Sequence, residues 1–381
     1  DFFTGGGLYI GGGAFSKAGF MSIDQADHLI IAGIYTNFNG QYKRPIVYRG
    51  DTLYTDTSKG DIVLFRIDPS GVLQWTKRIS STAYVYLIAT VTDQENNTTL
   101  VFENSETCFF DGVEFEAGQY LLQVDQDGLY KWHINISGMY VESLTRDCAN
   151  HIIAAGNTTS HSTGIPIDTT VFGQDTFIVY QYAPDSIKAG NQVFPPAGEF
   201  NLALLKFDES GDLLWQKQFP GQFNHVHVSA TYSDEIAVAA MLLSDSVNID
   251  NIILTPSSPV NQQPLFCMKT DASGTAIWAQ TYFNGSISWD LAMAPDGALY
   301  IGMEYYLSTA YAGVQIQSNG LQDILLTKLS PAGVFEWART VGGTNTNSRS
   351  VLSVNKQGDV AVSGFTFHIG DQVSKFDKSG N

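Results

Sequence analysis

The sequence has little positive charge, few cysteines and no long apolar run. Among its 381 residues only 20 are lysine or arginine, against 38 aspartate or glutamate, and the formal net charge is −18 at pH 7. Such a field repels phosphate backbones, so we expect no nucleic-acid partner. No segment approaches the roughly 18 apolar residues that a membrane helix needs, so we expect no membrane insertion.

Cysteine is scarce and odd in number. Cys108, Cys148 and Cys267 lie far apart in the sequence, an arrangement that indicates neither a disulfide framework nor a paired-cysteine metal site. The chain begins at Asp1 rather than at a methionine, which suggests that a signal peptide has been removed. Together with the many Asn, Thr, Gly and Tyr residues, this predicts a secreted or cell-surface protein.

A segment that ends in tryptophan recurs along the chain. Its copies are DPSGVLQW (68–75), DQDGLYKW (125–132), DESGDLLW (208–215), DASGTAIW (271–278), SPAGVFEW (330–337) and the shortened DKSGN (377–381). A recurrence at intervals of several tens of residues predicts an array of similar supersecondary units. We interpret the repeated aspartates and tryptophans as structural, the former in turns and the latter packed between units.

Short alternating runs predict strands throughout. In the last complete unit such runs cover 323–331, 333–340, 349–354 and 359–367, each rich in β-branched or aromatic residues and bounded by turn-forming residues. The D-x-x-G sequence between the first two favours a hairpin connection, so these strands should be antiparallel neighbours. No helical period is present. The sequence therefore predicts an all-β chain built from four-stranded antiparallel sheets.

Six such units predict a single domain, residues 1–381, with the fold of a six-bladed β-propeller of four-stranded antiparallel blades. A gapless shift aligns Gly11 with Gly342 and Gly33 with Gly364, so an N-terminal strand is expected to complete the last blade and close the ring. The third unit carries a long insertion at about 157–199. If this insertion folds as a blade of its own, the count becomes seven.

The repeat D-[IV]-x-L-x-[KR]-[LIF]-D-x-S-G-x-x-x-W, followed by V-x-V-x-G, resembles the bacterial β-propeller repeat often called SBBP over essentially the whole chain. The resemblance implies an extracellular or cell-surface propeller, frequently a module of a larger bacterial protein, without defined catalytic residues. The tryptophan docking motif of quinoprotein propellers and the Asp-box of sialidases are similar, but both differ in spacing. Neither activity is therefore transferred to this chain.

Polar residues that interrupt the innermost predicted strands form the first candidate site, because propellers carry function along the axis and on the loops of one face. Those we predict to line the axial channel are Lys17, Glu142, His225, His227, Asp290 and Arg349. His225 and His227 are two residues apart and should share one face of a strand, a spacing that suits Zn²⁺ if Glu142 or Asp290 supplies a third ligand. The alternative is that both histidines line a hydrated channel without metal.

Aromatic side chains in the predicted loops form the second candidate site, because exposed aromatics stack on sugar rings or anchor protein partners. The residues singled out are Tyr42, Tyr54, Tyr305 and Tyr306. Burial within the sheets is the alternative interpretation for each of them.

The function that we expect is a binding or adhesion module that recognises a glycan or a surface protein through loops on one face. A propeller enzyme, a hydrolase or lyase with an axial acid and histidine site, is the first alternative. A structural module of a larger surface or appendage protein is the second. No organic cofactor is indicated. If an ion is bound, the carboxylates and histidines suggest calcium or zinc.

Overall fold

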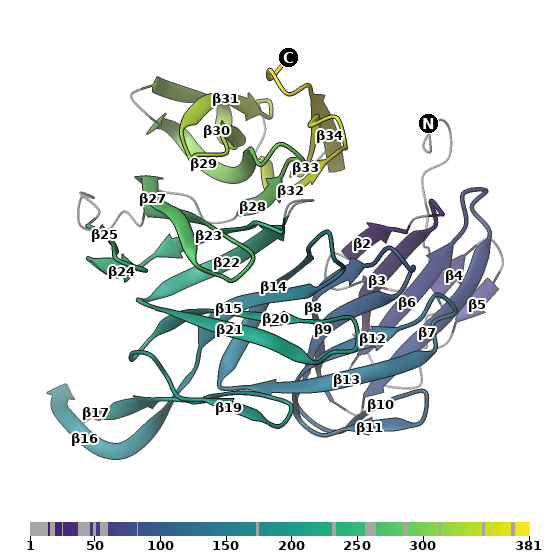
Figure 1. The fold of residues 1–381 in the computed structure, drawn as a ribbon, viewed down its shortest axis with the longest axis horizontal. Helices are drawn as coiled ribbons and strands as arrows, with labels where there is room; N and C mark the ends of the chain where they lie inside the picture. Colours follow the sequence, from purple (N-terminus) through teal and green to yellow (C-terminus); the bar gives the residue numbers. More distant parts are fainter. Residues whose placement is uncertain are drawn as a thin grey trace. The chain divides into compact units, whose positions relative to one another are not determined.

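The computed structural model describes residues 14–15, 20–24, 26–36, 46–48, 51–53, 60–81, 83–172, 175–230, 234–255, 264–284, 289–311, 314–344, 347–366 and 370–381. Within them all regular secondary structure is β-strand, which confirms the all-β prediction (Figure 1). These residues include no helix with the length and hydropathy that a membrane span requires. The chain forms two compact units, Asp1–Ser137 with Lys188–Gln192, and Gly138–Ile187 with Val193–Asn381.

The first unit contains two large antiparallel sheets. One has the order β1 (Ala14–Phe15), β3 (Leu29–Thr36), β6 (Asp61–Ile67), β7 (Leu73–Ser81), β10 (Cys108–Phe110) and β11 (Val113–Phe115), with β2 (Phe20–Ile23) on β3. The other has the order β8 (Val85–Thr92), β9 (Thr98–Asn104), β12 (Gly118–Val124), β13 (Tyr130–Ser137), β18 (Ile187–Ala189) and β19 (Gln192–Phe194). A hairpin joins β4 (Ile46–Tyr48) to β5 (Asp51–Leu53).

The second unit repeats one simple sheet in which the strand order follows the chain. The first sheet contains β14 (Met139–Arg146), β15 (Ile152–Thr158), β20 (Asn201–Phe207) and β21 (Leu213–Pro220). The next contains β22 (Phe223–Ala230), β23 (Ile236–Leu242), β26 (Pro264–Thr270) and β27 (Ala276–Asn284). The third contains β28 (Trp289–Met293), β29 (Leu299–Tyr311), β30 (Val314–Leu329) and β31 (Phe335–Val341), and β32 (Asn347–Val354), β33 (Val360–Thr366) and β34 (Gly370–Phe376) form a three-stranded sheet.

The long insertion forms two hairpins. One pairs β16 (Ser160–Phe172) with β17 (Asp175–Pro184), and the other is β18–β19. The strand-like sequence TFIVYQY therefore belongs to a two-stranded hairpin and not to a four-stranded sheet. The segment expected to close the ring, GLYIGG at residues 7–12, lies outside the described residues.

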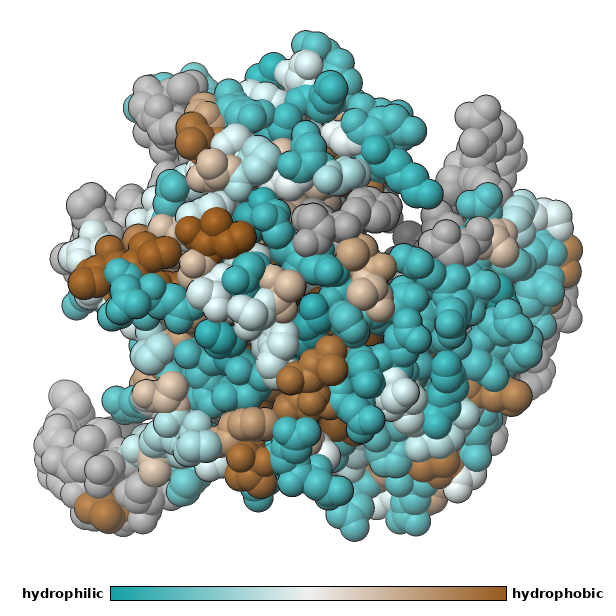
Figure 2. Space-filling view, viewed as in Figure 1, coloured by the Kyte–Doolittle hydropathy of each residue, from teal (hydrophilic) through white to brown (hydrophobic). Residues whose placement is uncertain are grey.

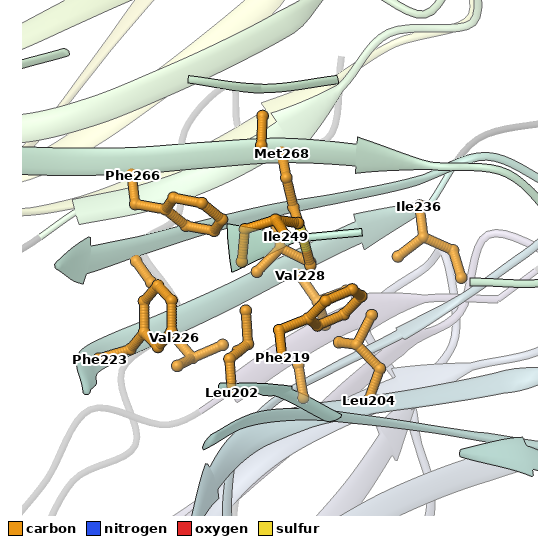
Figure 3. Packing of buried hydrophobic residues seen from close by; sticks show 14 of the residues in the cluster. Leu202, Leu204, Phe219, Phe223, Val226, Val228, Ile236, Ile249, Phe266 and Met268 are labelled. Atoms are coloured by element: carbon orange, nitrogen blue, oxygen red, sulfur yellow. The ribbon is translucent and has the colours of Figure 1, made fainter. Parts of the chain in front are cut away.

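Apolar side chains fill the space between consecutive sheets. Every residue of the central strands β20, β23 and β26 is buried, because each strand is covered on both faces. Figure 3 shows side chains of neighbouring sheets pointing toward one another, with Leu204 and Phe219 on one side and Val228, Phe266 and Met268 on the other. The surface is mainly hydrophilic on the face drawn in Figure 2, where apolar residues occur in separate small groups.

Small hairpins that sequence analysis did not predict lie between the second and third strands of several sheets. The hairpin β10–β11 pairs with β7, the outer strand of the preceding sheet, and β18 pairs with β13 in the same way. The hairpin of β24 (Val247–Ile249) and β25 (Ile252–Leu254) contacts β21 and β27. In its turn, Asp250 accepts a hydrogen bond from the backbone N–H of Ala276. These hairpins therefore cover or brace outer sheet edges that would otherwise be exposed.

The repeated turns have the structure that the sequence predicts. The first aspartate of each turn accepts a hydrogen bond from the backbone N–H two residues later, at 2.9 Å for Asp68, Asp125, Asp208 and Asp271. The glycines that end these turns have positive φ, for example +78° at Gly71, which is accessible to glycine without steric cost. The structural interpretation of the aspartates is therefore confirmed.

At four of the described tryptophans the ring packs against the turn of the following sheet. The pairs are Trp75 with Gly128, Trp215 with Gly274, Trp278 with Gly333, and Trp337 with Gly380. A Cβ atom at any of these glycines would lie 2.9–3.1 Å from ring atoms. The indole N–H also donates to a carbonyl of the same turn, at 2.8 Å from Trp75 to Gln126 and 3.0 Å from Trp278 to Pro331. We call this arrangement the tryptophan latch.

A buried cation completes the latch. It lies two residues before the first residue of the turn, and it is Arg66, Lys206, Lys269 or Lys328. Each contacts a carboxylate, at 2.6 Å from Arg66 to Asp24, 2.6 Å from Lys206 to Asp147, 2.6 Å from Lys269 to Glu235 and 2.9 Å from Lys328 to Glu336. Three of these cations also donate to the carbonyl that receives the indole N–H, namely those of Gln126, Pro331 and Lys378. Two donors and a ring face therefore hold each of these turns in place.

The latch predicts unequal effects for two alanine substitutions in glycines of similar φ. Gly128 has φ +72° and lies against the Trp75 ring, whereas Gly112 has φ +79° and no atom within 4 Å of its added Cβ. Gly112→Ala should lower the free energy of unfolding by about 1 kcal/mol, which is the cost of placing an alanine at positive φ. Gly128→Ala should cost about 1–3 kcal/mol more, because the ring must move.

The free energies of unfolding of both variants are measured by urea titration. Equal losses of stability in the two variants would show that the contact between turn and ring does not determine stability.

Candidate functional site

The first strands of the sheets in the second unit, which we call the inner strands, are neighbours in space although they belong to different sheets. Strand β22 lies against β14 and β28, and β28 lies against β32. Their connection is made by side chains that accept backbone N–H groups of the next strand. Ser143 accepts from Val228 at 3.1 Å, Ser229 accepts from Met293 at 3.0 Å, and Asp290 accepts from Leu352 at 2.8 Å.

Glu142 is fixed by two hydrogen bonds. It lies where the register of β14 shifts, between Val141 and Ser143, and such a bulge changes the direction of a side chain. Its Oε1 accepts from Asn157 Nδ2 at 2.6 Å, and its Oε2 accepts from the N–H of Val226 at 2.9 Å. Both oxygens are therefore used to hold β14 against β15 and β22.

Asp290 combines a structural role with a perturbed pKa. Its Oδ2 accepts the N–H of Leu352 and its Oδ1 accepts that of Leu291, both at 2.8 Å. Burial raises the pKa of this carboxyl group to about 6, and the two N–H donors oppose the rise. Asp290 is therefore ionised at pH 7 and becomes protonated in the mildly acidic range.

His227 lies beside this carboxylate, with its Nδ1 at 3.8 Å from Asp290 Oδ1. Burial lowers the pKa of His227 to about 4, and the charge of His225 adds to this effect. The imidazole is therefore neutral at pH 7. Its side chain keeps 30% of its surface exposed and that of Asp290 keeps 28%, so a ligand in solution can reach both groups.

His227 occupies a position that neighbouring strands use for structure. Ser143, His227 and Asp290 each lie nine residues before the start of the next strand of their sheet, at Ile152, Ile236 and Leu299 respectively. Ser143 and Asp290 accept the N–H of the adjacent inner strand. The N–H that His227 would accept by the same pattern is that of Leu291, but Asp290 accepts this N–H itself. The imidazole is thus not needed to join the strands.

His225 does not continue the alternation that the sequence predicts. It has φ +51° and lies in the irregular stretch of β22 between Asn224 and His227. Among the described residues, no group of three or more histidine, cysteine, aspartate or glutamate side chains is arranged to hold a metal ion. The carboxylates suggested as third ligands, Glu142 and Asp290, already accept hydrogen bonds within the protein. The zinc prediction therefore gains no support.

The remaining candidates divide into three groups. Lys17, Tyr42 and Tyr54 lie outside the described residues, as does the side chain of Arg349, whose backbone is at a register shift of β32. Tyr305 was predicted in a loop, and this is wrong: it lies in β29, is 1% exposed, and its hydroxyl bonds Thr340 Oγ1 at 2.7 Å. Its neighbour Tyr306 is 52% exposed, because successive side chains of a strand point to opposite faces.

Two exposed residues near the polar row were not predicted as binding residues. Tyr140 of β14 is 42% exposed and Asn224 of β22 is also exposed. The hydrogen bond from Val226 to Glu142 joins the two strands two residues beyond Asn224 and Tyr140. A signal was present in the sequence, since each follows the apolar residue that begins its strand and so falls on the exposed side of the alternation. We call Tyr140, Asn224, His225, His227 and Asp290 the axial niche.

Comparisons with known proteins identify distant structural similarity only. No family model matches the chain, and no curated protein matches it. A protein of unknown function from Dyadobacter fermentans is 9% identical, with coverage of 96% of this chain and 93% of that one and a TM-score of 0.45. The Dos1 propeller is 9% identical, with coverage of 95% and 93% and a TM-score of 0.43. The polysaccharide lyase Uly1 is 7% identical, with coverage of 96% and 91% and a TM-score of 0.42. Similarity this distant establishes neither a family nor a function, and nothing in it identifies the SBBP repeat.

The opposite pKa shifts in the axial niche predict opposite pH dependences. The pKa of Asp290 is raised in the folded state, so its contribution to stability is full below about pH 4 and is lost as the pH rises through 6. The pKa of His227 is lowered from 6.5, so its contribution is full above about pH 6.5 and is lost as the pH falls through 4. Between pH 4 and 6.5 the contribution of Asp290 to stability therefore falls as the pH rises, whereas that of His227 increases.

Relative to the unmodified protein, His227→Gln should therefore become less stable as the pH rises from 4 to 6.5, and Asp290→Asn should become more stable. Each change should amount to about 2 kcal/mol, since one pKa unit corresponds to about 1.4 kcal/mol. Urea unfolding of the three proteins across this range measures both. If the free energy of unfolding of each variant changed with pH in parallel with that of the unmodified protein, the two pKa shifts would be contradicted.

Proposed function

We propose that this chain is a β-propeller binding module, secreted or exposed at the cell surface, that recognises a glycan at the axial niche. The observation that carries the proposal is His227, a partly exposed neutral imidazole at a position that the adjacent strands use for structure. A polar group that the fold does not need, and that a ligand can reach, is what a binding site requires.

The chemistry of the surrounding residues suits a sugar. The exposed ring of Tyr140 offers an apolar face for stacking on a pyranose. The amide of Asn224 and the imidazoles of His225 and His227 supply both donors and acceptors, as needed for hydroxyl groups that do both. The Asp290 carboxylate, ionised at pH 7, is an acceptor beside them. The residues of the axial niche thus offer both aromatic and polar groups.

A propeller enzyme is the second candidate, and the pKa of Asp290 favours it. A carboxyl group with a pKa of about 6, 3.8 Å from an imidazole, can donate and accept protons in the mildly acidic range. Hydrolysis by two carboxylates is less well supported, because that reaction needs two available acids, and the oxygens of Glu142, like those of Asp290, already accept hydrogen bonds. A lyase or hydrolase would therefore depend on Asp290 and His227.

A glycan array followed by calorimetry with the full chain tests the proposal. Tyr140→Ala should weaken the binding of a selected glycan by about tenfold, the upper range for the loss of an aromatic contact. His227→Ala should weaken it as well. Tyr182→Ala is the matched control, because Tyr182 is also exposed, at 52% against 42% for Tyr140, in hairpin β16–β17 of the same unit, and it should bind normally.

Release of new sugar ends from a bound glycan, abolished by Asp290→Asn while binding persists, would favour the enzyme. The absence of glycan binding across the array would reject the proposed function and leave a structural role in a larger surface assembly as the alternative. Binding that is unchanged in both Tyr140→Ala and His227→Ala would place the glycan elsewhere on the protein.

A further inference from the structure

Another candidate site lies beside the tryptophan latch of Trp278. It is between the sheet β22–β23–β26–β27 and the sheet β28–β29–β30–β31. It is a cleft of about 540 Å³, within the range of small-molecule pockets. Its lining combines charged groups with apolar walls and comprises Glu235, Lys269, Asp296, Ile277, Trp278 and the turn residues Pro331 and Ala332. We call it the rim cleft.

The lysine of the rim cleft has no donor left for a ligand. Lys269 is 2% exposed, and its ammonium contacts Glu235 Oε2 at 2.6 Å and the carbonyls of Gly297 and Pro331 at 3.3 Å each. An ammonium group has three N–H donors, so these three acceptors satisfy it, and Glu235 balances its charge. The positive charge of the cleft is therefore used internally.

Asp296 remains as a carboxylate whose charge no basic residue of the cleft balances. Its Oδ1 accepts the N–H of Ala298 at 3.1 Å, which leaves acceptor capacity on a carboxylate. Lys269 is the single basic residue in the described lining, and it is paired with Glu235. The rim cleft thus has a net negative charge, in a chain whose own net charge is −18.

The walls of the rim cleft depart from the repeat. In the other copies the first turn residue is aspartate and the third is serine or aspartate, whereas here they are Ser330 and Ala332. Ser330 still holds the turn, because its hydroxyl accepts the N–H of Val334 at 3.1 Å. The latch therefore survives without the aspartate, and Ala332 leaves an apolar wall in place of a polar one. Ile277, which is 50% exposed, extends this wall.

We propose that the rim cleft receives an arginine or lysine side chain of a basic segment in a partner protein. The methylene stem of such a side chain packs against the apolar walls, and its cationic head reaches Asp296. Trp278 adds an aromatic surface, to which cations are attracted. The negative charge of the whole chain raises the local concentration of a basic partner. This interaction is independent of glycan binding at the axial niche.

The test uses the full chain and short capped peptides as probes. Acetyl-Gly-Arg-Gly-amide and its lysine analogue are titrated while the indole N–H resonance of Trp278, identified through Trp278→Phe, is followed by NMR. The same peptide with citrulline is the uncharged control of equal shape. Both basic peptides should shift the resonance in a saturable manner, and the citrulline peptide should bind at least about fivefold more weakly, as expected when a charge-assisted contact is lost.

Two variants separate charge from shape. Asp296→Asn keeps an acceptor for Ala298 and should weaken the arginine peptide about fivefold or more, because the charge is lost. Ala332→Leu fills the cleft from an exposed turn position and should abolish the shift without altering the charge. Asp212→Asn, which removes one charge from an exposed position of another repeated turn, is the matched control and should bind normally. Equal affinity for the arginine and citrulline peptides, or binding unchanged in both Asp296→Asn and Ala332→Leu, would overturn the proposal.

Discussion

The architecture depends on the contact between each tryptophan and the turn of the next sheet. An indole ring covers a glycine that has room for nothing larger, and its N–H and a buried cation converge on one carbonyl, as at Gln126 and Pro331. The cation is withdrawn from water, so removal of its carboxylate partner leaves a buried charge, at a cost of about 3–5 kcal/mol. Turn, outer strand and cation must therefore form together. This requirement explains why the segment that ends in tryptophan recurs in the sequence while the loops between its copies vary.

The first strand of each sheet lies opposite the tryptophan strand. There a different interaction joins neighbouring sheets, and it tolerates more residue types. The inner strands of the second unit are connected by side chains that accept N–H groups of the next strand, and serine, glutamate and aspartate all perform this task. Because many residue types can serve, the inner row varies in charge and size without loss of the connection. Where Asp290 binds the N–H of Leu291 itself, the position of His227 is released from structural duty. The axial niche is thus a consequence of how these strands are joined.

The sequence predicted the features that repeat, and local irregularity limited the rest. The strands, the aspartate turns and the packing of the tryptophans follow from period-two alternation and from turn chemistry, and they are confirmed. The β-bulges at Glu142 and His225 are invisible to an alternation rule, because one extra residue reverses every later side chain. Tyr305 was misplaced since β29 and β30 continue well beyond the other hairpins. The hairpins β10–β11 and β24–β25 have strands of three residues, too short for a periodic signal, although the recurrence of apolar residues around FFDGVEF and NIDNIIL could have revealed them.

Both proposed sites occur where one copy of the repeat departs from a role that its sister copies perform. In a repeated structure the sister copies define what the scaffold requires, so a departure that leaves the scaffold intact identifies residues available for another purpose. At His227 a strand-joining acceptor is replaced by an exposed imidazole while the strands remain joined. In the turn of Ala332 two polar residues are replaced by smaller or apolar ones while the latch to Trp278 is kept. The buried cations, each paired with a carboxylate, and the turn glycines of positive φ keep these roles in the described copies that have them, and for that reason we assign them to the scaffold alone.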